Sequence, residues 1–367
     1  MRTSFTEMVG TEFPIVAFSH CRDVVAAASN AGGLGVFGTA RFTPGELEHE
    51  LTWLDEHIPD GKYGLDVVIP ASHAGQHIAA RDARQELVQM IPPEHTKFVE
   101  TLLNSHGVPP SAETKYKFDT IGTTVDGAQQ LLSVAFEHRF VLLANALGPM
   151  PEDVVSRAHQ RGIKTAALVG NVPHALSQVK RGVDIIVAQG AEAGGHCGDI
   201  STMVLVPDVV DAVGDRPVLA AGGIGCGRQV AAALALGAAG VWTGSIWLTT
   251  TESELPPLLR EKMLQASATD TVRSRAMSGK PVRQLRTAWT DAWESADSPG
   301  ILPSPLQLML YASAEERIER HQSRALAGEA VGQIVGRMNS IRSTRAQLFD
   351  LVTEAVEAIE DLGSRLA

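Results

Sequence analysis

The feature that most constrains the fold is a regular alternation of short apolar runs with longer amphipathic segments in the middle of the chain. The apolar runs predict strands at 141–144, 165–169, 185–188, 218–220 and 240–242. The segments between them predict helices at 152–160, 173–180, 207–213 and 228–236. Short apolar strands joined by helical crossovers pair in parallel. The pattern therefore predicts a parallel sheet of the α/β class.

A glycine stands between each of these helices and the next strand. The four positions are Gly162, Gly182, Gly214 and Gly237. A helix commonly ends on a residue with positive φ, which glycine adopts without a Cβ penalty. Four repeats of this order support the alternation more strongly than any single one.

Three earlier apolar runs, at 15–18, 34–37 and 63–69, bring the number of predicted strands to eight. Eight is the number that closes a (β/α)8 TIM barrel. We expect such a barrel over 1–250, with a helical insertion at 70–119 after the third strand. Residues 251–367 predict a mainly helical region that covers the barrel mouth, with one amphipathic helix over 325–366. A doubly wound open sheet is the structural alternative.

Charge and cysteine content exclude several classes of protein. The 367 residues include 31 basic and 42 acidic ones, for a net charge of −11, which disfavours nucleic acid or an anionic membrane as a partner. Three cysteines without a CxxC pair predict neither a disulfide framework nor a zinc site. The N-terminus lacks the apolar run of a signal peptide, so we expect a cytoplasmic protein. The uncharged stretch 229–251 divides into a helix and a strand, which argues against a membrane span.

Two neighbouring loops predict a phosphate site. The segments 220–225 and 242–245 follow the seventh and eighth strands and are rich in glycine. Bare main-chain N–H groups and the N-terminus of a following helix attract anions, and barrels often bind phosphate at this position. Ser245 adds a hydroxyl donor. The alternative is that these glycines only form tight turns. The spacing over 223–227 is GxGxG rather than GxGxxG, so a mononucleotide is favoured over a dinucleotide.

The loop after the sixth strand, 189–198, carries the catalytic candidate. Gly194 and Gly195 would let the chain lie flat against a ring system, with His196 beside it. Histidine gives or takes a proton near neutral pH. The alternative is a solvated or structurally bonded histidine.

Five histidine and cysteine side chains fall in the loops of the predicted barrel mouth: His20, Cys21, His196, Cys197 and Cys226. Such ligands could bind zinc. The local ligand spacing of structural zinc sites is absent here, so we expect no metal and treat the cysteines as packing residues.

The segments 189–196 and 221–224, with Gly244 and Ser245, resemble the FMN-dependent nitronate monooxygenase family, formerly called 2-nitropropane dioxygenases. The segment 30–35 is also similar to the family. The resemblance covers about 10–70 and 120–290. FMN-dependent enoyl-acyl-carrier-protein reductases and NAD(P)H:quinone reductases share these motifs.

The resemblance implies an FMN-dependent oxidoreductase that oxidises alkyl nitronates with O2 to a carbonyl compound and nitrite. His196 is implied to be the catalytic base or the partner of the nitro group. The implied FMN-binding residues are Ala17, Phe18, Ser19, Asp66, Gln189, Gly194, Gly195, Gly222, Gly223, Trp242, Thr243, Gly244 and Ser245. Partners would be a small-molecule substrate, O2 or NAD(P)H, and a second subunit in a homodimer.

The sequence departs from the family's usual pattern in two places, one after the first strand and one at the end of the third. Phe18, Ser19, His20 and Cys21 stand where a Met with small residues is usual, and Asp66 stands where an Asn is usual. A carboxylate near the flavin would repel an anionic nitronate. The altered loop after the first strand and the large helical additions, which could build a bigger substrate cavity, motivate the alternative function, an FMN-dependent NAD(P)H reductase of an enoyl thioester or a quinone.

Overall fold

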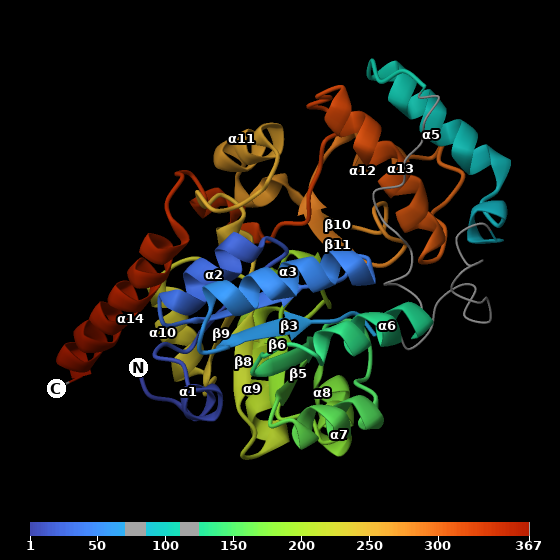
Figure 1. Cartoon of the computed structure of the whole chain (residues 1–367). Helices are drawn as coiled ribbons and strands as arrows, with labels where there is room; N and C mark the ends of the chain where they lie inside the picture. Colours follow the sequence, from blue (N-terminus) through green and yellow to red (C-terminus); the bar gives the residue numbers. More distant parts are fainter. Residues whose placement is uncertain (70–85, 111–124, 367) are drawn as a thin grey trace.

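The computed structural model describes residues 1–69, 86–110 and 125–366. Its centre is a closed barrel of eight parallel strands (Figure 1). In barrel order the strands are β1 (Ile15–Ser19), β2 (Leu34–Gly38), β3 (Tyr63–Asp66), β4 (Leu142–Asn145), β5 (Lys164–Val169), β6 (Ile185–Gln189), β8 (Val218–Ala221) and β9 (Gly240–Thr243). The predicted TIM barrel is confirmed, because β9 pairs back with β1 and no open sheet edge remains.

Helices cover the outside of the barrel. They are α2 (Arg22–Asn30), α3 (Pro44–His57), α6 (Val125–Ala135), α7 (Glu152–Gln160), α8 (Val172–Lys180), α9 (Thr202–Val213) and α10 (Gly227–Ala235). A short helix, α1 (Ser4–Val9), precedes β1. Its Phe5 and Val9 belong to the same apolar cluster as the residues inside the barrel, so α1 closes one end of the interior.

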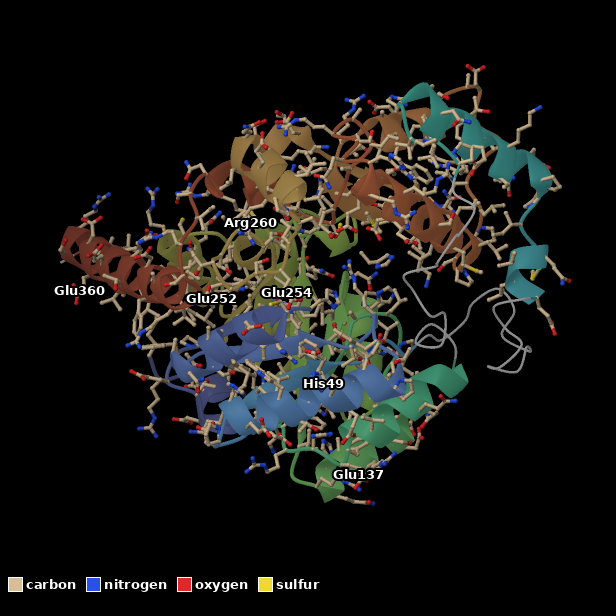
Figure 2. All side chains as sticks on the ribbon, turned by 45° about the horizontal axis from the view of Figure 1, so that its top comes forward. His49, Glu137, Glu252, Glu254, Arg260 and Glu360 are labelled. Atoms are coloured by element: carbon tan, nitrogen blue, oxygen red, sulfur yellow. The ribbon has the colours of Figure 1, made fainter. Side chains whose placement is uncertain are left out.

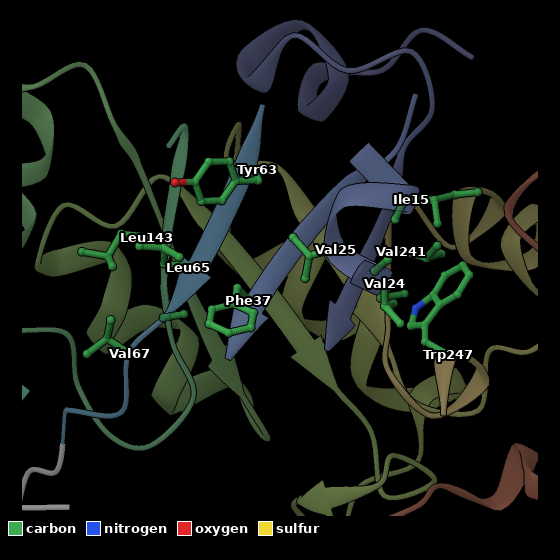
Figure 3. Packing of buried hydrophobic residues seen from close by; sticks show 14 of the residues in the cluster. Ile15, Val24, Val25, Phe37, Tyr63, Leu65, Val67, Leu143, Val241 and Trp247 are labelled. Carbon is green, nitrogen blue, oxygen red and sulfur yellow. The ribbon is translucent and has the colours of Figure 1, made fainter. Parts of the chain in front are cut away.

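Alternation along the strands produces two apolar layers. Val16 and Val36 belong to the cluster inside the barrel, whereas Ile15 and Phe37 belong to the cluster between barrel and helices. Successive side chains of a strand point to opposite faces, which explains this separation. Figure 3 shows the outer layer, where Phe37 lies near Leu65 and Val241 near Trp247.

Two predicted boundaries of the barrel elements are wrong. The third strand ends at Asp66 rather than at 69, because the N–H of Ile69 donates to the side-chain Oδ1 of Asn145 (3.1 Å) instead of to a neighbouring strand. Helix α9 begins at Thr202 rather than at 207 and includes Pro207. The N–H and Oγ1 of Thr202 both donate to the carboxylate of Glu192 (2.9 Å each), which fixes the earlier start.

The C-terminal region contains strands as well as helices. Its elements are α11 (Pro257–Gln265), β10 (Thr271–Ser274), β11 (Val282–Leu285), α12 (Ala288–Trp293), α13 (Leu306–Arg320) and α14 (Thr344–Leu366). Strand β11 pairs with β10 and with β7 (Gly195–His196), a short strand in the loop after β6. The C-terminal region is thus joined directly to a loop of the barrel mouth.

The described part of the predicted insertion 70–119 packs on this region. Helix α5 (Pro93–Ser105) shares an apolar cluster with α12 and α13, formed by Val99, Leu103, Trp289, Trp293 and Leu310. Figure 1 shows α5, α12 and α13 together on one side of the barrel. Residues 70–85 and 111–119 lie outside the described residues.

Helix α14 is shorter than predicted and lies beside the barrel, against α10 and α2 (Figure 1). It begins at Thr344, whose N–H and Oγ1 donate to the carboxylate of Glu252 (2.8 and 2.9 Å). Figure 2 shows Glu252 near the inner end of this helix and Glu360 near its outer end. Within the three described ranges, no helix has both the length and the apolar character that a bilayer span requires.

Candidate active site

A cavity of about 760 Å³ lies between the carboxyl ends of the barrel strands and the C-terminal region. It is lined by every predicted site residue except Ala17. Ala17 is fully buried in the layer between barrel and helices, because the alternation along β1 turns its side chain away from the cavity. From the C-terminal region, α11, α13 and the segment 327–334 contribute to the walls.

The loops after β8 and β9 bring unbonded main-chain donors into this cavity. Gly222 and Gly223 adopt positive φ values of 97° and 73°, which few other residues tolerate. The main-chain N–H groups of Gly223, Ile224 and Gly244 find no hydrogen-bond acceptor among the described residues. Unbonded N–H groups at a partly buried site are costly, so this arrangement favours an anionic ligand.

The helix that follows the β8 loop contributes less than expected. The N–H of Gly227, at the start of α10, donates to the carboxylate of Glu354 on α14 (2.8 Å). This helix terminus is therefore already occupied by an anion of the protein itself. The anion site depends on the loop amides.

The segment 328–338 is a part of the site that the sequence prediction missed. The N–H of Gly332 donates to Oγ of Ser245 (2.9 Å), and the N–H of Gln333 donates to the carbonyl of Glu192 (2.9 Å). A Cβ atom on Gly194 would lie only 2.7 Å from the main-chain nitrogen of Gly332. The available signal was the glycine spacing at Gly328, Gly332 and Gly336, which is unfavourable inside the helix that we expected there.

His196 lines the cavity and is fixed from the C-terminal region. Its main chain pairs with Val282 of β11, and its Nε2 lies 2.9 Å from Oγ of Ser278. The side chain of His196 is exposed toward the cavity, but the mass of protein around it and the repulsion from the nearby Lys280 ammonium lower its pKa to about 4. His196 is therefore neutral at pH 7.

The hydrogen bonds around Ser278 select one tautomer of this neutral imidazole. Oγ of Ser278 accepts from the N–H of Lys280 (3.3 Å) and can donate its single proton to the carbonyl of Lys280 (3.3 Å). No other donor among the described residues reaches that carbonyl. When Nε2 of His196 carries the proton and donates to Ser278, Oγ of Ser278 keeps its own proton for the carbonyl of Lys280, so these contacts favour that tautomer. Nδ1 is then the nitrogen with a free lone pair. Neither Ser278 nor Lys280 was predicted from the sequence, because their turn matches no known site motif.

Asp66 ends β3 in the same cavity and is 5% exposed. Its main-chain carbonyl accepts from both the N–H (2.9 Å) and Oγ1 (3.0 Å) of Thr39. Its side-chain Oδ1 is buried and has no partner among the described residues. Burial raises the pKa of this carboxyl to about 7, although the N–H of Ala146 acts in the opposite direction.

The residues after β1 form another wall. The ring of Phe18 stacks on Trp242 (6.2 Å between centroids) and meets His20 edge-on (5.2 Å). Nδ1 of His20 lies 2.9 Å from the carbonyl of Gly38. Burial, together with the charge of Arg41, lowers the pKa of His20 to about 4.

The five candidate metal ligands do not converge. Cys197 and Cys226 do not line the cavity, and no three of the five ligand atoms lie within 4.8 Å of one another in the described part of the chain. Sγ of Cys21 donates to the carbonyl of Glu252 (3.1 Å), as a packed thiol does.

Comparison with known proteins gives a consistent result. Residues 2–354 match the model of the nitronate monooxygenase family. A Mycobacterium tuberculosis protein that bears the name of a monooxygenase is 50% identical over 99% of this chain and 98% of its own length.

Two solved structures share the architecture. Nitroalkane oxidase from Streptomyces ansochromogenes superposes with a TM-score of 0.80 at 23% identity, covering 98% of this chain and 99% of its own. FabK from Thermotoga maritima superposes with a TM-score of 0.74 at 25% identity, covering 100% of this chain and 99% of its own. At 23% identity, the similarity to nitroalkane oxidase concerns the fold alone.

Proposed function

Because the chain belongs to the nitronate monooxygenase family and is an oxidoreductase, we propose that it binds FMN and oxidises alkyl nitronates with O2 to a carbonyl compound and nitrite. The observation that carries this proposal is the position of His196 in the cavity that also holds the unbonded N–H groups of Gly223, Ile224 and Gly244. One cavity thus offers an anion site and a proton acceptor.

The anion site fits the phosphate of FMN. The three N–H donors come from two adjacent strand ends, so they can approach one phosphate from two sides. Close packing leaves little space for side chains, since a Cβ on Gly222 would lie 3.0 Å from the carbonyl of Gly190. Main-chain amides bind phosphate without a cluster of basic residues, which suits an acidic chain.

The remaining cavity residues support the reaction. Bound FMN would supply the redox chemistry by accepting electrons from the substrate and passing them to O2. The ammonium of Lys280, which lines the cavity, would hold the anionic nitro oxygens. Nδ1 of His196 would accept a proton from the substrate or return one to it, because Ser278 occupies the other ring nitrogen, Nε2. The C-terminal region covers the site and limits access of water.

An anaerobic stopped-flow experiment tests the proposal. The purified protein should be yellow, and a nitronate such as ethyl nitronate should bleach the bound flavin within the turnover time. His196→Asn should keep the flavin but lose about 10²–10⁴-fold in turnover, the usual contribution of a general acid or base. Fast bleaching by NADPH with none by the nitronate would exclude the nitronate reaction.

One observation favours the second candidate, a flavin-dependent NAD(P)H reductase of an enoyl thioester or quinone. The cavity extends past the barrel mouth along the apolar residues Leu258, Leu259, Leu308 and Met309 of α11 and α13. This surface is larger than a short nitronate needs and would suit a long apolar chain. The similarity to FabK agrees with that candidate. The NADPH arm of the same experiment decides between the two functions.

A further inference from the structure

We propose that Asp66 keeps its proton in the active site and donates it in a hydrogen bond to an acceptor atom of the bound flavin, so that a neutral carboxylic acid helps to hold the cofactor. This inference rests on the flavin site proposed above. It assigns to Asp66 a role as a donor, which an ionised aspartate cannot have.

The environment of the Asp66 carboxyl group favours the protonated form. Asp66 is only 5% exposed. It takes part in no ion pair among the described residues. An isolated buried carboxylate is so costly that such a group normally keeps its proton. The raised pKa agrees with this expectation.

The geometry of the carboxyl group favours a hydrogen bond to a ligand. Oδ1 is buried without a hydrogen-bond partner among the described residues, while Asp66 lines the cavity. The unpartnered oxygen is a polar atom that lacks a ligand at the wall of a ligand cavity. A flavin presents carbonyl oxygens and ring nitrogens, which accept hydrogen bonds. A protonated Asp66 therefore gives the buried carboxyl a hydrogen-bond partner on the flavin.

The charged and titratable groups on the neighbouring elements do not provide a counterion. His20 and Arg41 follow β1 and β2 on one side, and His196 follows β6. His20 and His196 are neutral near pH 7, because each has a pKa lowered to about 4. Arg41 lies 3.7 Å from Glu329, with Glu315 also close to it. On the other side, β4 contributes the neutral amide of Asn145.

The protonated form also removes an electrostatic objection. An ionised Asp66 would repel a nitronate and disfavour negative charge on a bound flavin. A neutral donor at this position does neither, so the departure from Asn leaves anion chemistry possible. Asp66 protonated on one oxygen presents a donor there and an acceptor on the other oxygen, as the Asn amide presents donors on its nitrogen and an acceptor on its oxygen.

The experiment measures the dissociation constant of FMN by flavin fluorescence between pH 5.5 and 9 for the wild type, Asp66→Asn and Asp66→Ala. Riboflavin is titrated in parallel, because it lacks the phosphate, whose own ionisation contributes near pH 6. The wild-type affinity should fall by up to about tenfold per pH unit above the pKa of Asp66, as linkage requires. Asp66→Asn should bind with little dependence on pH in this range, and Asp66→Ala should bind weakly at every pH.

An independent measurement uses the infrared spectrum of the wild-type protein. A protonated carboxyl band that is absent in Asp66→Asn, and that shifts when FMN is added, is expected near neutral pH. The proposal is overturned if wild type and Asp66→Asn have parallel pH profiles, or if no such band exists. Its failure is distinct from failure of the proposed function. A yellow, nitronate-active enzyme with parallel profiles refutes only the Asp66 proposal, whereas absence of flavin binding in every variant refutes the flavin site.

Discussion

Nε2 of His196 lies 2.9 Å from Oγ of Ser278, a hydroxyl 82 residues further along the chain. The contact joins a loop of the barrel to the turn between β10 and β11, whose strand β11 also pairs with β7. The orientation of the imidazole is thus determined by the C-terminal region. An isolated barrel would have the histidine without the hydroxyl that selects its tautomer.

Replacing Ser278 with Ala should shift the tautomer of His196 and slow turnover. Without the acceptor on Nε2, the proton can move to Nδ1, and kcat should fall about tenfold, the scale of one hydrogen bond near 1.4 kcal/mol. Imidazole ¹⁵N chemical shifts, assigned with His196→Asn, report the tautomer directly. Ser278→Thr should restore both values, and Ser295→Ala, at an exposed helix end, is the control. Unchanged shifts and turnover in Ser278→Ala would show that the contact does not position the base.

The barrel was predictable from local sequence. Helix–glycine–strand repeats such as those at Gly162 and Gly182 reflect short-range preferences of the chain, and the observed strands match the predicted ones within one residue at most ends. Similarly, glycine-rich loops at strand ends indicated Gly223 and Gly244, because the strand ends of a barrel meet at one face.

Contacts between distant segments were not predictable in this way. Ser278 and Gly332 reach the site through the fold of the C-terminal region, and no local pattern marks their destination. Ala17 was predicted to bind the cofactor because of its place in the sequence, but it does not line the cavity. Ala17 and Phe18 are neighbours in sequence, but the alternation along the strand places Phe18 at the cavity and Ala17 in the outer core.

Gly223→Asp should prevent FMN binding by more than the backbone strain that the same change causes at another glycine of positive φ. The substitution adds a negative charge where the loop amides are proposed to hold a phosphate, at a residue with φ of 73°. Like charges in contact cost several kcal/mol, so affinity should fall by at least about 100-fold. Gly162→Asp is the matched control, since Gly162 has a similar φ of 72° and a Cβ there meets no atom within 4 Å. Flavin fluorescence and circular dichroism separate the two effects, and wild-type affinity in Gly223→Asp would mean that the phosphate lies elsewhere.

Asp66 should make the flavin-free protein less stable as pH rises. Its pKa is about 7 in the folded state against 3.8 for the ordinary group, so between these values the folded state holds a proton that the unfolded state has lost. Stability contributed by this proton is complete below pH 4 and is lost as pH rises toward 7. Asp66→Asn lacks this loss, and its advantage over the wild type should grow to roughly 4 kcal/mol. Urea unfolding at several pH values measures the difference. A constant difference between pH 4 and 8 would contradict the prediction.

Gly227 and Gly363 should respond oppositely to the same change. A Cβ on Gly227 would lie 2.3 Å from the main-chain nitrogen of Ala355, so Gly227→Ala forces α10 and α14 apart. Overpacking of this kind costs about 1–3 kcal/mol. Gly363 lies in the outer part of α14, where a Cβ meets no atom within 4 Å. Gly363→Ala should therefore stabilise the helix by about 0.5–1 kcal/mol, because alanine loses less backbone entropy than glycine. Urea unfolding of both variants gives the two signs. If Gly227→Ala unfolded at the wild-type urea concentration, the close packing of α14 on the barrel would not exist in solution.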